Sequence, residues 1–579
     1  MWAVWGLWIC TLGLAVITGF WCLTSARKNR FDRARRRKQL YAREAIVNFG
    51  ITGDQAESLA FSRKPPQLGT YELGIRAACM RARWASDVFN CVSEECFLDS
   101  ILRAKAADKS QEDLGLIAGL PVSVCDALAT TGLEAAVGVI EHVNDGAADE
   151  DCAAVAALRG AGGIVVCKSA VSTYAVNRHD TYSPLLGATL NPWDPKLTVS
   201  GPDGGGAVLC ALGVAKIHIG TESLAAGADM KVPSFAFSHD RASTQGRRPV
   251  PGPAAPTSLI ACDVATLTKA VSVILEPMLI ARNDPLAVPM PFDTAAYESR
   301  EKLVVGIPTG RGWIQESLSL NHSAANALTK RGHKLIEFPI GISSKELVVL
   351  RTALYTAERL RAIPKVIDPQ GSDPFVKAIR FWLTMPPFLR APIAAALERT
   401  PWRRYLGWIL HGVQLGSNDR NYQRLTKRRE EIRSTLVERM VRNGVDALIM
   451  PCNEPQPRNR ESLSLVDAFG GIHHEFSMLN LPMGSAPVVV SSSIERSSKP
   501  SPAEEFRRVS VIVVVPPWQD ELCLSLLRDL EEEFGTEAPP NISDSFRKWS
   551  TPSPEGEIAK ETTPLLNKLK GNLQAAPAQ

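Results

Sequence analysis

Apolar and polar positions along the chain alternate between short strand-like runs and amphipathic helices. Apolar runs of strand length occupy residues 119–125, 163–167, 216–219, 303–306, 334–338, 446–450 and 510–515. Between them, apolar side chains at three-to-four-residue spacing predict helices over 77–104, 151–160, 207–213, 323–331 and 520–534. In the 151–160 helix, Asp151 lies near the N-cap and Gly160 near the end. Strands that alternate with helices predict an α/β fold, in which helices cover a mixed, twisted sheet.

The first 26 residues contain no charged side chain and are rich in Trp, Leu, Ile and Val. A helix of about 20 such residues crosses the hydrocarbon core of a bilayer. Eight basic residues follow between positions 27 and 38, and positive charge stays on the cytoplasmic side. We therefore predict a transmembrane anchor over 1–26, a basic juxtamembrane and helical segment over 27–75, and a cytosolic body. A cleaved signal peptide is the alternative, but it would carry charge before the apolar run.

A second apolar, aromatic stretch lies at 375–412 and is punctuated by arginines. Its basic residues are Arg390, Arg399, Arg403 and Arg404, and its aromatic residues include Phe381, Trp382, Phe388, Trp402 and Trp408. Helices with aromatic residues on one side and arginine on the other are typical of the lipid interface. We predict a membrane-facing helical cap here, with an ordinary helical hairpin packed on the core as the alternative.

Charge and composition exclude several kinds of function. The net charge of +4, from 65 basic and 61 acidic residues, is too balanced to indicate nucleic-acid binding. The 12 cysteines form no CxxC pair and the nine histidines show no metal-ligand spacing, so we expect no metal and no cofactor. Residues 535–579 are polar and contain prolines, which predicts a disordered tail after a 76–534 domain. Within that tail, residues 561–566 resemble an acidic dileucine sorting signal of endosomal membranes.

Residues 198–233 have the pattern of a catalytic segment. Glycines are frequent there, as in a loop whose backbone approaches a ligand. Several short motifs accompany this segment in order: Gly119-Leu-Pro-Val-Ser-Val-Cys125, Leu186-Gly-Ala-Thr-Leu-Asn-Pro-Trp193, Gly220-Thr-Glu222 and Pro517-Trp-Gln-Asp-Glu-Leu-Cys-Leu524. Together they resemble the amidase-signature family, and within it the membrane-bound fatty acid amide hydrolases. The resemblance runs, with gaps, over most of residues 70–534.

The resemblance implies a Ser–Ser–Lys triad, in which a neutral lysine accepts a proton through a bridging serine while a second serine attacks the amide. In this chain the lysine position is Cys125, and the bridging serine falls on Pro202, next to Asp203. The nucleophile falls on Asp229 when counted back from Pro233. Counted forward from Gly220 it falls on Ala226, because this stretch has three extra residues. Neither count reaches a serine.

These replacements predict a pseudoenzyme that keeps the fold and has lost the family reaction. The loop expected to bind substrate or an oxyanion comprises Gly220, Thr221, Leu224, Ala225 and Ala226, and its Cβ atoms crowd a close backbone approach. The retained function would be binding of a membrane lipid or fatty acyl amide, at endoplasmic reticulum or endosomal membranes. A homodimer, as in the family, stays open.

Two alternatives keep some chemistry. Ser223 or Ser200 could act as a relocated nucleophile of an active serine hydrolase of fatty acid amides, although neither has a clear base. Cys125 could pair with His218, but a buried structural cysteine is the simpler expectation.

Overall fold

The computed structural model describes residues 53–60, 69–110, 112–143, 145–175, 177–248, 256–276, 284–309, 318–357, 381–400, 404–416, 421–452, 476–491, 506–536 and 545–546. The predicted anchor over 1–26, most of the juxtamembrane segment and most of the tail lie outside these residues. Among the helices built from the described residues, none combines the length and the apolar character that a bilayer crossing requires.

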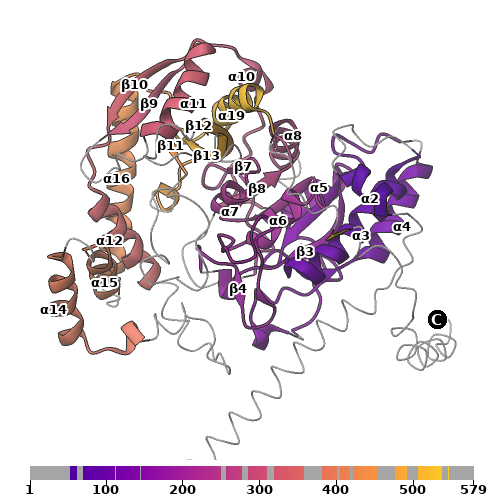
Figure 1. The fold of residues 1–579 in the computed structure, drawn as a ribbon, viewed down its shortest axis with the longest axis horizontal. Coiled ribbons are helices and arrows are strands. Elements are labelled where there is room, and N and C mark those ends of the chain that lie inside the picture. Colours follow the sequence, from indigo (N-terminus) through magenta and orange to yellow (C-terminus); the bar gives the residue numbers. More distant parts are fainter. Residues whose placement is uncertain are drawn as a thin grey trace, which may run out of the picture.

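Eleven strands of the described residues form one mixed sheet, in the order β1-β3-β2-β6-β8-β7-β12-β13-β11-β9-β10 (Figure 1). The strands β3, β2 and β6 run parallel at one end of the sheet and β11, β9 and β10 at the other, with antiparallel pairs between them. The bounds are β1 Val92–Glu95, β2 Pro121–Cys125, β3 Ile164–Ser169, β6 Ile217–Thr221, β7 Ser234–Ala236, β8 Thr257–Ala261, β9 Val304–Thr309, β10 Lys334–Pro339, β11 Ala447–Pro451, β12 Met483–Ser491 and β13 Phe506–Val514. Two further strands, β4 Tyr182–Ser183 and β5 Gly187–Ala188, form a small hairpin sheet. The predicted α/β fold with a mixed sheet is confirmed.

The helices with described bounds are α2 Gly53–Ala60, α3 Tyr71–Phe89, α4 Phe97–Lys109, α5 Ala153–Gly160, α6 Gly204–Ala211, α7 Leu224–Asp229, α8 Val264–Ile274, α10 Thr294–Glu298, α11 Leu318–Lys330, α12 Ser344–Tyr355, α14 Pro387–Glu398, α15 Arg404–Gly416, α16 Tyr422–Arg442 and α19 Asp520–Phe534. One predicted helix, over 77–104, is wrong. Asn90 ends α3 in the left-handed conformation, with φ 55°, and β1 follows before α4 begins. Asn tolerates this conformation better than most residues.

The prediction that Asp151 lies near the N-cap of α5 is confirmed. Helix α5 begins at Ala153, and Cys152, the residue after Asp151, occupies the N-cap position without a capping hydrogen bond from its side chain. The Asp151 carboxylate instead accepts hydrogen bonds from the Thr131 amide at 2.8 Å and from Arg159 Nη1 at 2.9 Å. The acidic side chain before this helix therefore binds a neighbouring loop.

The sheet buries apolar side chains on both faces, because successive residues of a strand point to opposite sides. In β3, Val165 packs with one cluster while Ile164 and Val166 pack with another. Helices α5, α8, α11 and α19 cover the first face. Helices α3, α4 and α6 cover one end of the second face, and α12 and α16 cover its other end (Figure 1).

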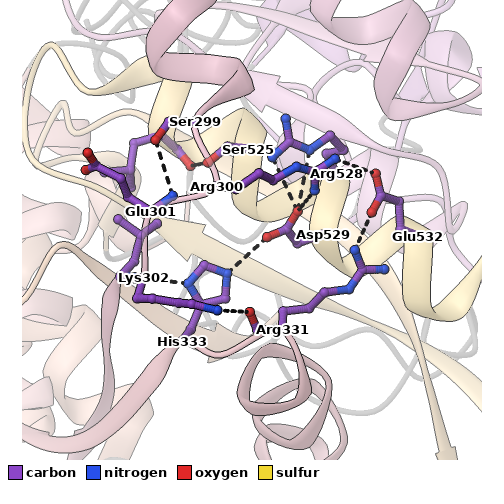
Figure 2. A network of polar contacts seen from close by, with 12 residues as sticks. Ser299, Arg300, Glu301, Lys302, Arg331, His333, Ser525, Arg528, Asp529 and Glu532 are labelled. Atoms are coloured by element: carbon purple, nitrogen blue, oxygen red, sulfur yellow. Dashed lines mark hydrogen bonds and ion pairs between the residues drawn. The ribbon is translucent and has the colours of Figure 1, made fainter.

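A network of ion pairs fastens α19 to the start of β9 and the end of α11 (Figure 2). Asp529 is buried and accepts from His333 Nε2 at 3.0 Å and from Arg300 Nη1 at 3.1 Å, while Arg331 pairs with Glu532. Burial by itself would raise the pKa of Asp529. The hydrogen bond from His333 and the nearby arginine charges outweigh burial, so this pKa lies below its usual value.

We expect Asp529→Ala to destabilise the protein by about 2 kcal/mol, because it removes the buried acceptor of the hydrogen bonds from His333 and Arg300. The measurement is the midpoint of chemical unfolding at neutral pH. The matched control is Glu533→Ala, which removes the outer pair with Lys330, 2.6 Å apart, on the same helix. That pair involves an exposed lysine, so the control should change the midpoint little. Equal effects of the two variants would contradict the role of Asp529.

Candidate functional site

Two parallel strands bring Ser123 and His218 together at the centre of the sheet. Ser123 of β2 lies opposite His218 of β6 in the register, and the two side chains meet with Oγ and Nδ1 2.9 Å apart. Their strand neighbours, among them Val122 and Ile219, pack on the opposite face. Ser123 and His218 therefore point toward α6.

Asp203, the residue just before α6, is the hub of this site. His218 Nε2 lies 2.8 Å from Asp203 Oδ2, and Ser169 Oγ donates to Asp203 Oδ1 at 2.5 Å. Since a carboxylate only accepts hydrogen bonds, His218 donates from Nε2, and its Nδ1 faces the Ser123 hydroxyl. Ser223 Oγ lies 3.5 Å from Asp203 Oδ2.

A further serine completes the cluster, which we call the Asp203 network. Ser258 Oγ accepts from the Ser223 amide at 2.9 Å and donates to Ser223 Oγ at 3.1 Å. All six members have 0% exposed surface: Ser123, Ser169, Asp203, His218, Ser223 and Ser258. The connectivity Ser123–His218–Asp203 has the order of an acyl-transfer triad, and all three side chains are buried among the described residues.

Two glycines allow the network to close. A Cβ on Gly206 would lie 2.2 Å from the His218 ring, and a Cβ on Gly220 would lie 2.2 Å from Asp203 Oδ2. Any larger residue at either position would push the polar groups apart. Gly220 and Thr221, which were predicted to belong to a binding loop, are thus the last two residues of β6 and pack near Asp203.

Cys125 lies at the end of β2, fully buried beside Asp203. Burial, and then the negative charge of Asp203, raise the pKa of the Cys125 thiol well above its usual value. A protonated thiol is a poor nucleophile, so the Cys125–His218 thiol pair gains no support. The His218 nitrogens face Ser123 and Asp203.

A buried lysine on the next strand lies outside the Asp203 network. Lys168 Nζ donates to the carbonyl oxygens of Glu134 at 2.7 Å and Asp126 at 3.2 Å, and lies 3.8 Å from the Asp126 carboxylate. Its neighbour Ser169 is the residue that contacts Asp203. Successive side chains of a strand diverge, so the Lys168 ammonium is directed away from the Asp203 network.

The stretch predicted to have three extra residues contains the short helix α7. Both counted nucleophile positions, Ala226 and Asp229, lie in this helix. Leu224 and Ala225 are buried, and Ala226 packs in the core beneath α3 and α6. Asp229 ends α7 half-buried, and its Oδ2 accepts from the Ser200 amide at 3.1 Å. Burial raises the pKa of Asp229 to about 6, although the Ser200 hydrogen bonds oppose the shift.

The structure therefore brings Cys125, Asp203 and Ser223 together and holds Asp229 apart from them. Pro202 directly precedes Asp203 and is joined to Gly201 by a cis peptide, and its carbonyl accepts from the Ser172 amide at 2.8 Å. The alignment of Cys125, Pro202 and Asp229 with a catalytic triad stays a prediction.

The turn between β6 and α7 is anchored by an ion pair that composition did not reveal. Glu222 has φ 55° and its carboxylate lies 2.5 Å from Arg178 Nη2. Tyr355, the last residue of α12, donates to Glu222 Oε2 at 3.2 Å, and the Arg178 guanidinium lies 4.7 Å from the centre of the Tyr355 ring. Arg178 Nη1 also donates to Ser477 Oγ at 2.7 Å. Four distant segments thus meet at one guanidinium.

The predicted cap contains α14 and α15, which pack on each other, and α15 also packs on α12. They form the lower left of Figure 1, away from α3 and α4. Phe388 of α14 is 73% exposed and Phe381 is 58% exposed, while Trp382 and Trp408 are half-buried. Trp402 lies outside the described residues. The apolar face of α14 is unusually exposed for a helix of a folded domain.

A surface cavity of about 380 Å³ lies elsewhere, between the ends of α5 and α8. Its wall includes Leu116, Ala161, Leu275, Glu276 and Phe292, and no member of the Asp203 network. Within the described part of the chain, no cluster of three or more His, Cys, Asp or Glu side chains is placed to hold a metal.

The family model named Amidase matches residues 74–524, which is more than half of the chain. This protein belongs to the amidase family. It is 24% identical over 458 residues to fatty-acid amide hydrolase 1 of Sus scrofa, covering 72% of this chain and 76% of that protein. It is 24% identical over 318 residues to Amidase 2 of Gibberella moniliformis, covering 52% of this chain and 57% of that protein.

Solved structures agree with this fold. A fatty acid amide hydrolase structure superposes with a TM-score of 0.62 at 15% sequence identity, covering 87% of this chain and 90% of that one. At this identity the likeness shows the amidase fold alone. The predicted family resemblance is confirmed by the family model.

Sequence reasoning missed most of the Asp203 network. Ser123, Ser169 and Ser258 were not singled out, and His218 was considered only as a partner of Cys125. A signal was present, because Ser123 and His218 each stand between two apolar residues of a strand. Buried polar groups are almost always hydrogen-bonded, so several such residues in neighbouring strands indicate mutual contact.

Asp229 should make stability depend on pH. Its pKa of about 6 exceeds its ordinary 3.8, so the folded state holds a proton that the unfolded state releases as pH rises between these values. The free energy of unfolding is then highest below about pH 4. It decreases as the pH rises to about 6, by about 3 kcal/mol at most. Asp229→Asn should remove this decline. The measurement compares unfolding midpoints at pH 4.5 and 7.

The control for that comparison is Asp149→Asn, because Asp149 is exposed. The control should keep the pH dependence of the wild type. Parallel pH profiles for Asp229→Asn and the wild type would contradict a buried, proton-holding Asp229.

Proposed function

We propose that this amidase-family protein is a membrane-anchored, non-catalytic binder of a lipid or fatty acyl amide. The observation that carries the proposal is the Asp203 network, which fills the centre of the site with mutually satisfied and fully buried polar groups. A catalytic triad needs a nucleophile that substrate can reach and a base that is free to take its proton. The described residues of the network offer neither.

The fatty acyl amide class rests on the relationship to fatty-acid amide hydrolase 1, whose name gives its substrates. The membrane part of the proposal rests on two observations. Residues 1–26 are uncharged and precede a basic cluster, and α14 exposes Phe388 and Leu389. Aromatic and apolar side chains at a protein surface favour the lipid interface. Cytosolic orientation and a homodimer are further parts of this proposal.

An active serine hydrolase is the second candidate, with Ser223 as its nucleophile. In its favour, Ser223 follows the left-handed Glu222 in a turn and lies 3.5 Å from the Asp203 carboxylate. Against it, the Ser223 hydroxyl is fully buried and engaged with Ser258. His218 faces Ser123 rather than Ser223 through its second ring nitrogen.

A fluorophosphonate probe separates the two candidates. We expect the full-length protein to show no labelling above that of the heat-denatured sample, and no measurable hydrolysis of oleamide. Labelling or turnover that disappears in Ser223→Ala would overturn the non-catalytic proposal. Ser200→Ala tests the other candidate nucleophile, which lies in the neighbouring loop and whose amide contacts Asp229. Labelling that disappears in this variant would overturn the proposal as well.

Restoring the family residues should not restore turnover. In Cys125→Lys the new ammonium would lie beside the Asp203 carboxylate, which would keep it charged and therefore unable to act as a base. We expect the triple variant Cys125→Lys, Pro202→Ser, Asp229→Ser to remain inactive in the same oleamide assay. Full recovery of turnover would show that Asp203 and α7 do not block the chemistry.

The cap can be tested by supplying oleamide in phosphatidylcholine vesicles to the full-length protein. We expect Phe388→Glu to slow uptake of labelled oleamide by about tenfold, because a charge replaces a residue that is 73% exposed on the proposed lipid face. Leu98→Glu is the matched control, since Leu98 is 66% exposed on α4, far from the cap. Equal uptake by the two variants would argue for an ordinary surface helix.

A further inference from the structure

A single residue from the C-terminal segment is buried against the opposite part of the molecule. Phe546 has 0% exposed surface, although it follows the end of α19 at Phe534 by 12 positions in a polar stretch. Its ring lies 5.3 Å from the Trp84 ring of α3 at an interplanar angle of 73°. Trp84 in turn packs edge-on against Phe89, at 5.3 Å. Thus at least one residue of the predicted disordered tail is held in the core.

The base of this aromatic site is a buried arginine. Arg81 is 1% exposed, and its guanidinium carbon lies 4.7 Å from the centre of the Phe546 ring and 5.6 Å from that of Trp84. A guanidinium over an aromatic face is attracted by the ring quadrupole, more strongly where water is excluded. Phe546 therefore closes the site over a charge as well as filling a hydrophobic gap.

The same guanidinium holds the end of α6. Arg81 Nε and Nη2 both donate to the carbonyl oxygen of Leu212, the residue that caps α6, at 3.1 and 2.7 Å. A cation at the C-terminus of a helix is favourable, because the last carbonyl groups lack partners within the helix. Helix α6 begins with three consecutive glycines, which weaken a helix. Its order therefore depends on contacts at its ends.

The other end of α6 adjoins Asp203. A continuous series of contacts thus runs from Phe546 to Arg81, from Arg81 to the end of α6, and from the start of α6 to the Asp203 network. We propose that the site formed by Arg81, Trp84 and Phe89 around the Phe546 ring is a docking site for a peptide segment with an aromatic anchor. The chain fills this site with its own Phe546 segment, and its occupancy controls the order of α6.

A tethered segment has an effective concentration of about millimolar at its own site. A free peptide at micromolar concentration cannot compete with it. The site should therefore accept a peptide in trans only after the resident ring has been removed.

The test uses the full-length protein and a fluorescent peptide that spans residues 541–550. Phe546→Ala protein should bind this peptide, with at least a tenfold higher affinity than the wild type, in a polarisation assay. A peptide that carries Ala in place of the Phe should not bind either protein. Equal binding to wild type and Phe546→Ala protein, or no binding to either, would overturn the proposal.

Hydrogen exchange of α6 supplies the second readout. We expect Phe546→Ala to speed exchange of the α6 amides at least fivefold, and saturating peptide to restore the slow rate. Phe546→Leu keeps the site filled but removes the ring from Arg81, so α6 should still exchange faster in a folded protein. Phe388→Ala is the control, because it removes an exposed phenylalanine from α14. Unchanged exchange of α6 in both Phe546 variants would sink the proposed coupling.

Discussion

A carboxylate with no exposed surface must be matched by donors, and the centre of this protein is arranged around that requirement. Asp203 meets His218, Ser169 and Ser223, which come from two strands and the turn before α7. A buried charge that lost these partners would be costly. Three features of the fold serve this one interaction. They are the parallel register of β2, β3 and β6, the glycines beside these strands, and the start of α6.

The network follows from the same alternation that buries apolar side chains on both faces of a strand. This alternation directs Ser123, His218 and Ser169 inward. There Ser123 contacts His218, and both His218 and Ser169 contact Asp203. Buried polar networks of this kind favour one arrangement of the core, because every misplacement leaves a group unsatisfied.

The fold was largely predictable from sequence, and the site only in part. Helix α19 has its predicted bounds of 520–534, because a strong apolar stripe lies between a proline-rich turn and Gly535. The break at Asn90 was missed, since it depends on one left-handed residue. The network partners Ser123, Asp203 and His218 lie 15 to 95 positions apart. Their contact depends on strand register, which a single sequence does not reveal.

Arg178 joins the turn before α7 to the last residue of α12, the helix on which α15 of the cap packs. A stacked and ion-paired guanidinium is a stiff connector, because its plane and its charge are both restrained. Movement of the outer helices would therefore tilt the turn between β6 and α7. Force on the outer helices would be transmitted inward through this one side chain, so an event at the surface of the molecule would alter the turn in its interior.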